Sequence, residues 1–228
     1  MKQAALKLNL CGIRNKHNSN QMLLNGNTFN GMKIQSDKGP LIVDYLNKAY
    51  FCFINSINQY SRVFMLRFDL HLPDGYPNHL SFNNALIEKF FASLKAKIKH
   101  SQATKRRDGL RVHDTDLRDI WCRERSNQGR VHYHVAILLN HDAYAHIGEF
   151  SLYKENMFTR LHEAWASALM IYVDDVLGLI NIPPNSTYCI HRDDITSFEN
   201  AFYRISYFCK MDSKDFNSGH HSFGSSRV

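Results

Sequence analysis

The stretch DIWCRERSNQGRVHYHVAILL, residues 119–139, contains two runs with strand character joined by a short polar link. The runs are residues 119–125 and 131–139, and SNQGR (126–130) lies between them. A link of this length that contains glycine is typical of a β-hairpin. The stretch therefore predicts two neighbouring antiparallel strands.

A further strand is predicted over residues 62–72, RVFMLRFDLHL, where two kinds of side chain alternate. Because successive side chains of a strand point to opposite faces, each kind occupies one face. One face would carry Phe64, Leu66, Phe68, Leu70 and Leu72, and the other Met65, Arg67, Asp69 and His71. We expect the first face to contact the core, and the turn residues PDG (73–75) to end the strand.

Four segments show the hydrophobic spacing of helices. They are residues 41–56, 81–100, 153–170 and 195–211. Ser81 is expected to cap the second helix, and Asp193 or Asp194 the last one. A short strand is also expected at residues 188–191. Helices interspersed with hairpin strands predict an α+β fold, with an antiparallel sheet and helices packed mainly on one of its faces.

The N-terminal part of the chain has a different composition. Residues 9–39 are crowded with Asn, Gly, Ser and Lys and show no sustained hydrophobic period. We therefore expect residues 1–39 to form a flexible or loosely packed arm. A single folded domain would span residues 40–228, which is long enough for one sizeable core.

The charge of the chain favours a polyanionic partner. Lys and Arg number 28 against 21 Asp and Glu, so the formal net charge is +7. The candidate DNA contacts are the densest basic run, Lys95, Lys97, Lys99, Lys105, Arg106, Arg107 and Arg111, together with Arg67, Lys214 and Arg227. The alternative for the run is an ordinary solvated helix end and loop.

The cysteines and the hydropathy pattern indicate the cellular compartment in which the protein is expected. Five cysteines, an odd number, are widely spaced and form no CxxC pair, which argues against a disulfide framework or a structural zinc knuckle. No apolar run approaches the ~20 residues of a membrane span. The first residues also lack the apolar stretch of a signal peptide. We expect a cytoplasmic protein with reduced thiols and no membrane partner.

Three residues of the predicted hairpin suggest a metal site. His132 and His134 are two positions apart on one strand and therefore share a face. If the hairpin is centred on Gln128, Glu124 lies directly opposite His132 on that face. Two imidazoles and a carboxylate leave coordination positions open and favour Mg²⁺ or Mn²⁺, with Zn²⁺ as an alternative. The structural alternative is a pair of surface histidines, with Glu124 paired to a neighbouring arginine.

The last predicted helix carries a polar stripe opposite its apolar face. Tyr203, Tyr207 and Lys210 follow one another at steps of four and three residues. Placed over a metal site, a tyrosine hydroxyl can attack a phosphodiester as a covalent nucleophile. The ammonium of Lys210 would then stabilise the charge that develops on the phosphate. The structural alternative is a rim of tyrosines packed against another element.

Four motifs together resemble a known family. WCRE (121–124), HYHVAILLN (132–140), YRISYFCK (203–210) and FGSSR (223–227) resemble the replication endonucleases of filamentous phages and their prophage-encoded relatives, in the HUH endonuclease superfamily. In HUH endonucleases two histidines around a hydrophobic residue bind the metal, and a downstream Tyr-x-x-Lys carries the nucleophile. The resemblance covers roughly residues 60–228.

This resemblance implies a sheet of about five antiparallel strands with flanking helices. It also implies a divalent-metal-dependent nick in DNA, a 5′-phosphotyrosine, and a free 3′-hydroxyl that can prime synthesis. Tyr207 would attack first because it stands three residues before Lys210, and Tyr203 would act second, although the order of the two stays open.

The sequence thus predicts a sequence-specific DNA nicking endonuclease encoded by a phage or mobile element. It would act on single-stranded or supercoiled origin DNA in a bacterial host, either to start replication of its own element or to nick a competitor genome. A helicase and a polymerase would come from the host or from another encoded protein. Two alternatives stay open, namely a metal-independent DNA-binding origin or regulatory protein, and an HUH transposase.

Overall fold

A computed structural model describes residues 13–77, 83–126, 128–212, 214, 216 and 219–226. Within these residues the largest sheet has six strands, and its main path follows the order β10-β6-β8-β7-β11, with β9 beside β6. The strands are β6 (Arg62–His71), β7 (Arg118–Arg125), β8 (Val131–Asn140), β9 (Ile180–Asn181), β10 (Thr187–His191) and β11 (Phe223–Ser225). All of their pairings are antiparallel, which confirms the predicted α+β class and the β7–β8 hairpin.

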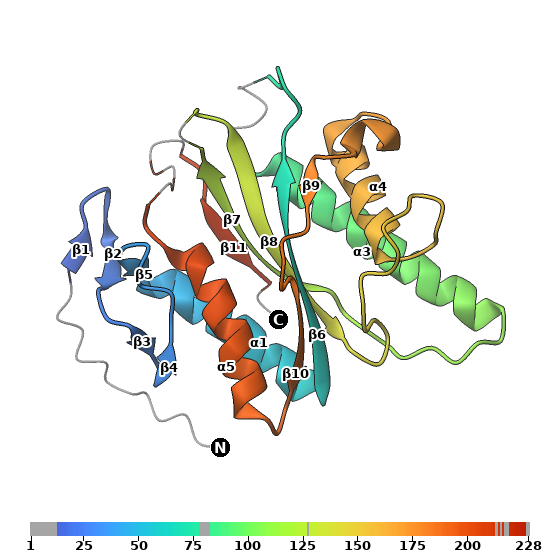
Figure 1. The fold of residues 1–228 in the computed structure, drawn as a ribbon, viewed down its shortest axis with the longest axis horizontal. Helices are drawn as coiled ribbons and strands as arrows, with labels where there is room; N and C mark the ends of the chain where they lie inside the picture. The colour runs from blue at the N-terminus through green and yellow to red at the C-terminus, as the bar shows by residue number, and fades with distance from the viewer. Residues whose placement is uncertain are drawn as a thin grey trace.

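Helices cover both faces of this sheet (Figure 1). Helices α1 (Val43–Gln59) and α5 (Ile195–Ser206) pack on one face, and α3 (Ala85–Arg107) and α4 (Met157–Leu169) on the other. The prediction of helices mainly on one face is therefore wrong. Helices cover both faces because β6 is apolar on both. Phe64 and Leu66 face α3 and α4, whereas Val63 and Met65 face α1 and α5. A central strand that is buried on both faces needs an apolar layer on each.

The N-terminal region is packed rather than loose. It contains β1 (Ile13–Asn15), β2 (Asn18–Leu24), β3 (Thr28–Phe29), β4 (Met32–Lys33) and β5 (Leu41–Ile42). Phe29 is buried and stacks on Phe202 of α5, with ring centroids 6.1 Å apart. The predicted arm is thus wrong for residues 13–39, while residues 1–12 lie outside the described residues. The few apolar residues of the segment 13–39 are spaced too irregularly to show a hydrophobic period. Several of them are nevertheless buried in the core that α1 and α5 share.

The last helix begins at a predicted cap and ends earlier than predicted. Helix α5 is capped by Asp194, whose Oδ1 accepts a hydrogen bond from the backbone N–H of Thr196 at 3.0 Å. The helix ends at Ser206 and continues as a 3₁₀ turn, η2 (Tyr207–Cys209), rather than as α-helix to residue 211. A second 3₁₀ turn, η1 (Val173–Val176), follows α4. Ser81, the predicted cap of α3, lies outside the described residues.

The edge strand β11 closes the sheet beside β7. Gly224 pairs with Trp121, and a Cβ added at Gly224 would lie 2.5 Å from the indole ring. Glycine is therefore required for the close approach of β11 to Trp121. Among the described residues, none of the helices combines the length and the apolar character needed to cross a bilayer.

Replacing Gly224 by alanine tests this contact. We expect Gly224→Ala to lower the free energy of unfolding by about 1–3 kcal/mol, because the methyl group overlaps the Trp121 ring and must displace it. Urea denaturation measures this decrease. Gly26→Ala is the matched control, since its Cβ would meet only Leu24 Cδ1 at an ordinary 3.7 Å. Equal stability of the two variants would contradict the proposed packing of β11.

Candidate metal centre

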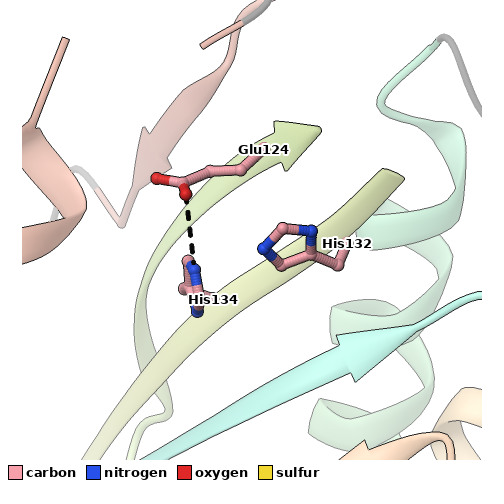
Figure 2. Close-up of side chains that lie close together, drawn as sticks. All are labelled: Glu124, His132 and His134. Atoms are coloured by element: carbon pink, nitrogen blue, oxygen red, sulfur yellow. Dashed lines mark ion pairs between the residues drawn. The ribbon is translucent and has the colours of Figure 1, made fainter. Parts of the chain in front are cut away.

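The β7–β8 hairpin brings three metal-binding side chains together (Figure 2). Glu124 of β7 pairs with His132 of β8, which confirms the register expected from the sequence. His134 lies two residues further along β8 on the same face. One ligand atom from each of the three residues lies within 4.8 Å of the others. This cluster, which we call the metal triad, faces the side of the sheet covered by α1 and α5.

Strand β6 supports the triad from the other side of β8. Asp69 pairs with His134 in the ladder, and its Oδ1 lies 2.6 Å from Nδ1 of that ring. Nε2 of His134 is thereby directed at Glu124, whose Oε2 is 3.5 Å away. A carboxylate behind an imidazole is the arrangement that orients metal-binding histidines and selects their tautomer. Asn181 of β9 in turn donates to Oδ2 of Asp69 at 3.2 Å.

His71 extends this arrangement at the end of β6. It pairs with His132 in the ladder, and the two rings stack with centroids 5.8 Å apart. The sequence placed Asp69 and His71 on the strand face opposite the one expected to contact the core, without indicating a role for either. Their contacts with the histidines of β8 follow from the β6–β8 register.

Two buried ammonium groups hold the carboxylate of Glu124. Nζ of Lys214 lies 2.5 Å from Oε1, and Nζ of Lys210 lies 3.0 Å from Oε2. Burial alone would raise the pKa of Glu124, but the hydrogen bond with His134 and the charge of Lys214 hold this pKa well below its usual range. Glu124 is therefore ionised and directed into the site.

The two histidines of the triad differ in their electrostatics. Burial and the neighbouring His134 lower the pKa of His132 to about 4, so its ring is neutral and has a lone pair to donate. Burial opposes the charged form of His134 as well, yet its hydrogen bonds with Asp69 and Glu124 raise its pKa. A metal ion at Nε2 of His134 would thus replace a proton.

This donor set fits one divalent ion. Two imidazoles and one ionised carboxylate match the mixed nitrogen and oxygen ligands of Mn²⁺, and they leave positions for water or a phosphate oxygen. Oε2 of Glu124, the oxygen that faces His134, also contacts Lys210. An ion bound there would compete with Lys210 for that oxygen.

The predicted nucleophile lies beside this triad. The ring of Tyr207 is 5.6 Å from the ring of His134, measured between centroids. Nζ of Lys210 donates to the hydroxyl of Tyr207 at 2.5 Å and lies 4.0 Å from the centre of its ring. A 3₁₀ turn has three residues per turn, so side chains at i and i+3 share a side. Residues three apart are also neighbours on an α-helix, so the contact of Tyr207 with Lys210, which directly follows η2, agrees with the common side expected from the sequence.

The second predicted tyrosine occupies a different environment. Tyr203 lies on α5 one turn before Tyr207 and is 44% exposed. It lines an open groove of about 540 Å³ between α5 and β10. The assignment of Tyr203 as a second nucleophile stays a prediction.

Most of the predicted basic contacts lie away from the triad. Residues 95–107 lie on α3, which packs on the opposite face of the sheet, and Arg111 follows that helix. Lys95, Lys97 and Arg106 form ion pairs with Asp119, Glu163 and Asp114. The basic run therefore does not lie around the metal triad. The hydropathy pattern alone does not indicate which face of the sheet this helix covers.

The remaining basic candidates fall in three different places. Lys214 is buried against Glu124, so its assignment as a surface contact to DNA is wrong. Arg67 is also buried, with its guanidinium 6.0 Å from the ring centre of Tyr207. Arg227 lies outside the described residues.

Comparison with known proteins places the chain in a family. Residues 24–226 match the YagK/YfjJ C-terminal domain. The chain belongs to this family. The YagK/YfjJ match begins inside β2 and includes the metal triad, Tyr207 and Lys210. The family region thus includes part of the N-terminal segment that the sequence predicted as an arm.

Two relatives come from Escherichia coli strain K12. "Uncharacterized protein YagK" is 32% identical over 204 residues, which cover 85% of this chain and 97% of YagK. "Uncharacterized protein YfjJ" is 31% identical over 207 residues, which cover 86% of this chain and all of YfjJ. No solved structure gives a significant match. Neither relative's name states an activity, so the function of this YagK/YfjJ family member is argued from its site.

Removing either histidine of the triad tests metal binding. We expect His132→Ala and His134→Ala each to abolish detectable Mn²⁺ binding in isothermal titration calorimetry, because two ligands do not hold the ion. His141→Ala, just beyond the far end of β8, is the matched control and should bind Mn²⁺ as wild type does. Unchanged Mn²⁺ binding in both triad variants would rule out this metal centre.

Asp69 provides a second test, because it contacts His134 rather than the metal position. We expect Asp69→Asn to weaken Mn²⁺ binding roughly 10- to 100-fold, as removal of a carboxylate behind a ligand histidine does. The same calorimetric titration measures this change. Asp142→Asn, an ion-paired aspartate beside β8, should leave Mn²⁺ binding unchanged. An affinity of Asp69→Asn equal to wild type would show that Asp69 does not orient His134.

Proposed function

We propose that the protein is a metal-dependent, sequence-specific DNA nicking endonuclease of the HUH type. The observation that carries this proposal is the convergence of a tyrosine and a lysine on the metal triad. The ring of Tyr207 lies beside that of His134, and Lys210 contacts both Glu124 and the hydroxyl of Tyr207, from the turn that follows α5. A tyrosine hydroxyl, an ammonium and a divalent-metal site are together the groups that phosphodiester transesterification requires.

In the proposed reaction the oxygen of Tyr207 attacks a phosphorus atom of the DNA strand. The new bond joins this oxygen to the 5′-phosphate, and the bond between phosphorus and the 3′ oxygen breaks. The phenol loses its proton and the 3′ oxygen gains one, so the step is balanced without a further reactant. A bound metal would polarise the phosphate and stabilise the charge that it develops.

Each residue of the site has a defined part in this scheme. Lys210 donates to the oxygen of Tyr207 and would stabilise it as a phenolate, both before attack and when the phosphotyrosine is resolved. Glu124 and the histidines would hold the metal. Lys214 positions Glu124 from the interior, because its ammonium contacts Oε1.

The biological setting of the proposal follows from the resemblance to phage replication endonucleases. The protein would act in the cytoplasm of a bacterial host, on DNA of its own mobile element or of a competing one. Helicase and polymerase activities would come from other proteins. Two relatives from Escherichia coli are compatible with a bacterial host.

One observation favours the alternative of a metal-independent DNA-binding protein. Glu124 contacts two ammonium groups, so its charge is balanced without a metal ion. His134 likewise contacts Asp69. In that case the polar cluster would stabilise the fold, and DNA binding would not depend on Mn²⁺.

A covalent-adduct assay separates the two functions. Incubation of wild-type protein with Mn²⁺ and single-stranded DNA from its own replicon should give a protein–DNA adduct that survives denaturing electrophoresis. Tyr207→Phe should abolish the adduct, because it lacks the attacking oxygen while keeping the ring next to His134.

Tyr153→Phe is the matched control, since Tyr153 is 97% exposed on a loop far along the chain from the site. It should form the adduct at the wild-type rate. An adduct that persists in Tyr207→Phe, or that forms equally without any divalent metal, would disprove the proposed reaction.

A further inference from the structure

Arg67 lies in the interior with an unused hydrogen-bond donor. Its side chain is 9% exposed, and its Nε has no hydrogen-bond partner among the described residues. The nearest carboxylate is Asp69, 3.6 Å from the guanidinium, and this carboxylate already accepts from His134 and Asn181. A buried charged group with an unpaired donor is costly unless a ligand completes its contacts.

Arg204 of α5 is half-buried and also has an unpaired donor. It lies on α5 three residues before Tyr207, so both side chains project from the same side of the helix. Its Nε is also buried and without a partner, and among the described residues no carboxylate pairs with it. Burial and then the charge of Arg204 lower the pKa of Arg67, against the opposing charge of Asp69. In the structure both arginines are placed beside Tyr207, since the Arg67 guanidinium lies 6.0 Å from its ring centre and Arg204 precedes it by three residues on α5.

Both arginines are next to the candidate nucleophile. The guanidinium of Arg67 lies 6.0 Å from the ring centre of Tyr207 and 5.7 Å from that of Phe208. Lys210 instead contacts the hydroxyl of Tyr207, and His134 of the metal triad lies beside the ring of Tyr207. The unused donors thus lie beside the site of the proposed reaction, separate from the groups that would act on the attacked phosphate.

We propose that Arg67 and Arg204 bind a phosphate of the DNA strand adjacent to the phosphate that Tyr207 attacks. Guanidinium groups present several N–H donors to phosphate oxygens, and each of these two has a buried Nε without a partner among the described residues. That the anion belongs to the attacked strand rests on the proposed function. The binding of phosphate by these two side chains does not require that Tyr207 react.

The surface next to Arg204 is suited to the rest of such a nucleotide. The open groove between α5 and β10 is lined mostly by amides, hydroxyls and the rings of Tyr188 and Tyr203, together with Cys189 and the carboxylate of Asp194, which caps α5. It contains no lysine or arginine among its lining residues. Amides and tyrosine rings are suited to base edges and base faces rather than to phosphates. A strand could therefore pass from Tyr207 over the two arginines and into this groove.

The test measures DNA binding apart from catalysis. The probe is a fluorescein-labelled, random-sequence single-stranded 20-mer, and fluorescence anisotropy gives its dissociation constant at several salt concentrations. We expect Arg204→Gln to raise the dissociation constant several-fold and to reduce the salt slope by about 0.7, because one phosphate fewer is neutralised. Arg204→Lys should retain most of the slope because it keeps the charge.

Arg62→Gln is the matched control, because Arg62 is a partly exposed, ion-paired arginine at the start of β6 that is not among the candidate DNA contacts. It should bind the probe nearly as wild type does. A wild-type affinity and salt slope for Arg204→Gln, or an equal weakening in Arg62→Gln, would overturn the proposal. Arg67→Lys is a second variant at the buried position, and its thermal unfolding shows whether weaker binding reflects misfolding.

The adduct assay distinguishes this proposal from the proposed function. If wild type forms no adduct but Arg204→Gln still weakens binding and lowers the salt slope, the phosphate site stands and the nicking reaction does not. If the adduct forms and Arg204→Gln binds as wild type does, the nicking reaction stands and the phosphate site does not.

Discussion

Strand β8 lies between β6 and β7, and the registers of these two pairings decide which side chains meet in the candidate site. The β7 register places Glu124 opposite His132, and the β6 register places Asp69 opposite His134. A shift of either strand by one residue would turn its side chains to the other face, where α3 and α4 pack. The apolar residues on both faces of β6 and β8 oppose such a shift, because it would move each apolar side chain out of the core layer in which it packs. The metal triad therefore depends on the same packing that stabilises the sheet.

The charges around Tyr207 form a network with more basic than acidic groups. The acidic groups are the carboxylates of Glu124 and Asp69, and the basic groups are Lys210, Lys214, Arg67 and Arg204. Burying charges stabilises a protein only where each is well paired, and here Lys210 and Lys214 pair with Glu124 while Arg204 has no acidic partner among the described residues. An excess of positive charge at a partly enclosed position is suited to bind an anion. The DNA phosphates of the proposed reaction would supply this anion.

The local geometry of the last helix also matters for the chemistry. Residues three apart are neighbours on an α-helix, where they differ by about 60° around the axis, and they lie in line in a 3₁₀ turn, so both geometries keep Lys210 close to Tyr207. The turn lies where α5 leaves the sheet, and Lys210 then pairs with Leu41 of β5 through the backbone. Strand β5 thus helps to position the residue that contacts the nucleophile. Gln35, within the segment predicted as an arm, also donates its backbone N–H to Oγ of Ser206 at the end of α5, at 2.9 Å.

The sequence by itself determined the features that depend on neighbours along the chain. Period-two alternation and a short polar link predicted the hairpin and the pairing of Glu124 with His132, and the spacing of Tyr207 and Lys210 predicted their common side. Only the tertiary structure decided what lies far apart in sequence but close in space. It placed Lys214 in the interior against Glu124, Asp69 behind His134, and Arg67 beside Tyr207. It also packed Phe29 into the core and put α3, with its basic run, on the far face of the sheet. These contacts depend on how layers of helices cover two faces of one sheet, and no periodicity within a single segment contains that information.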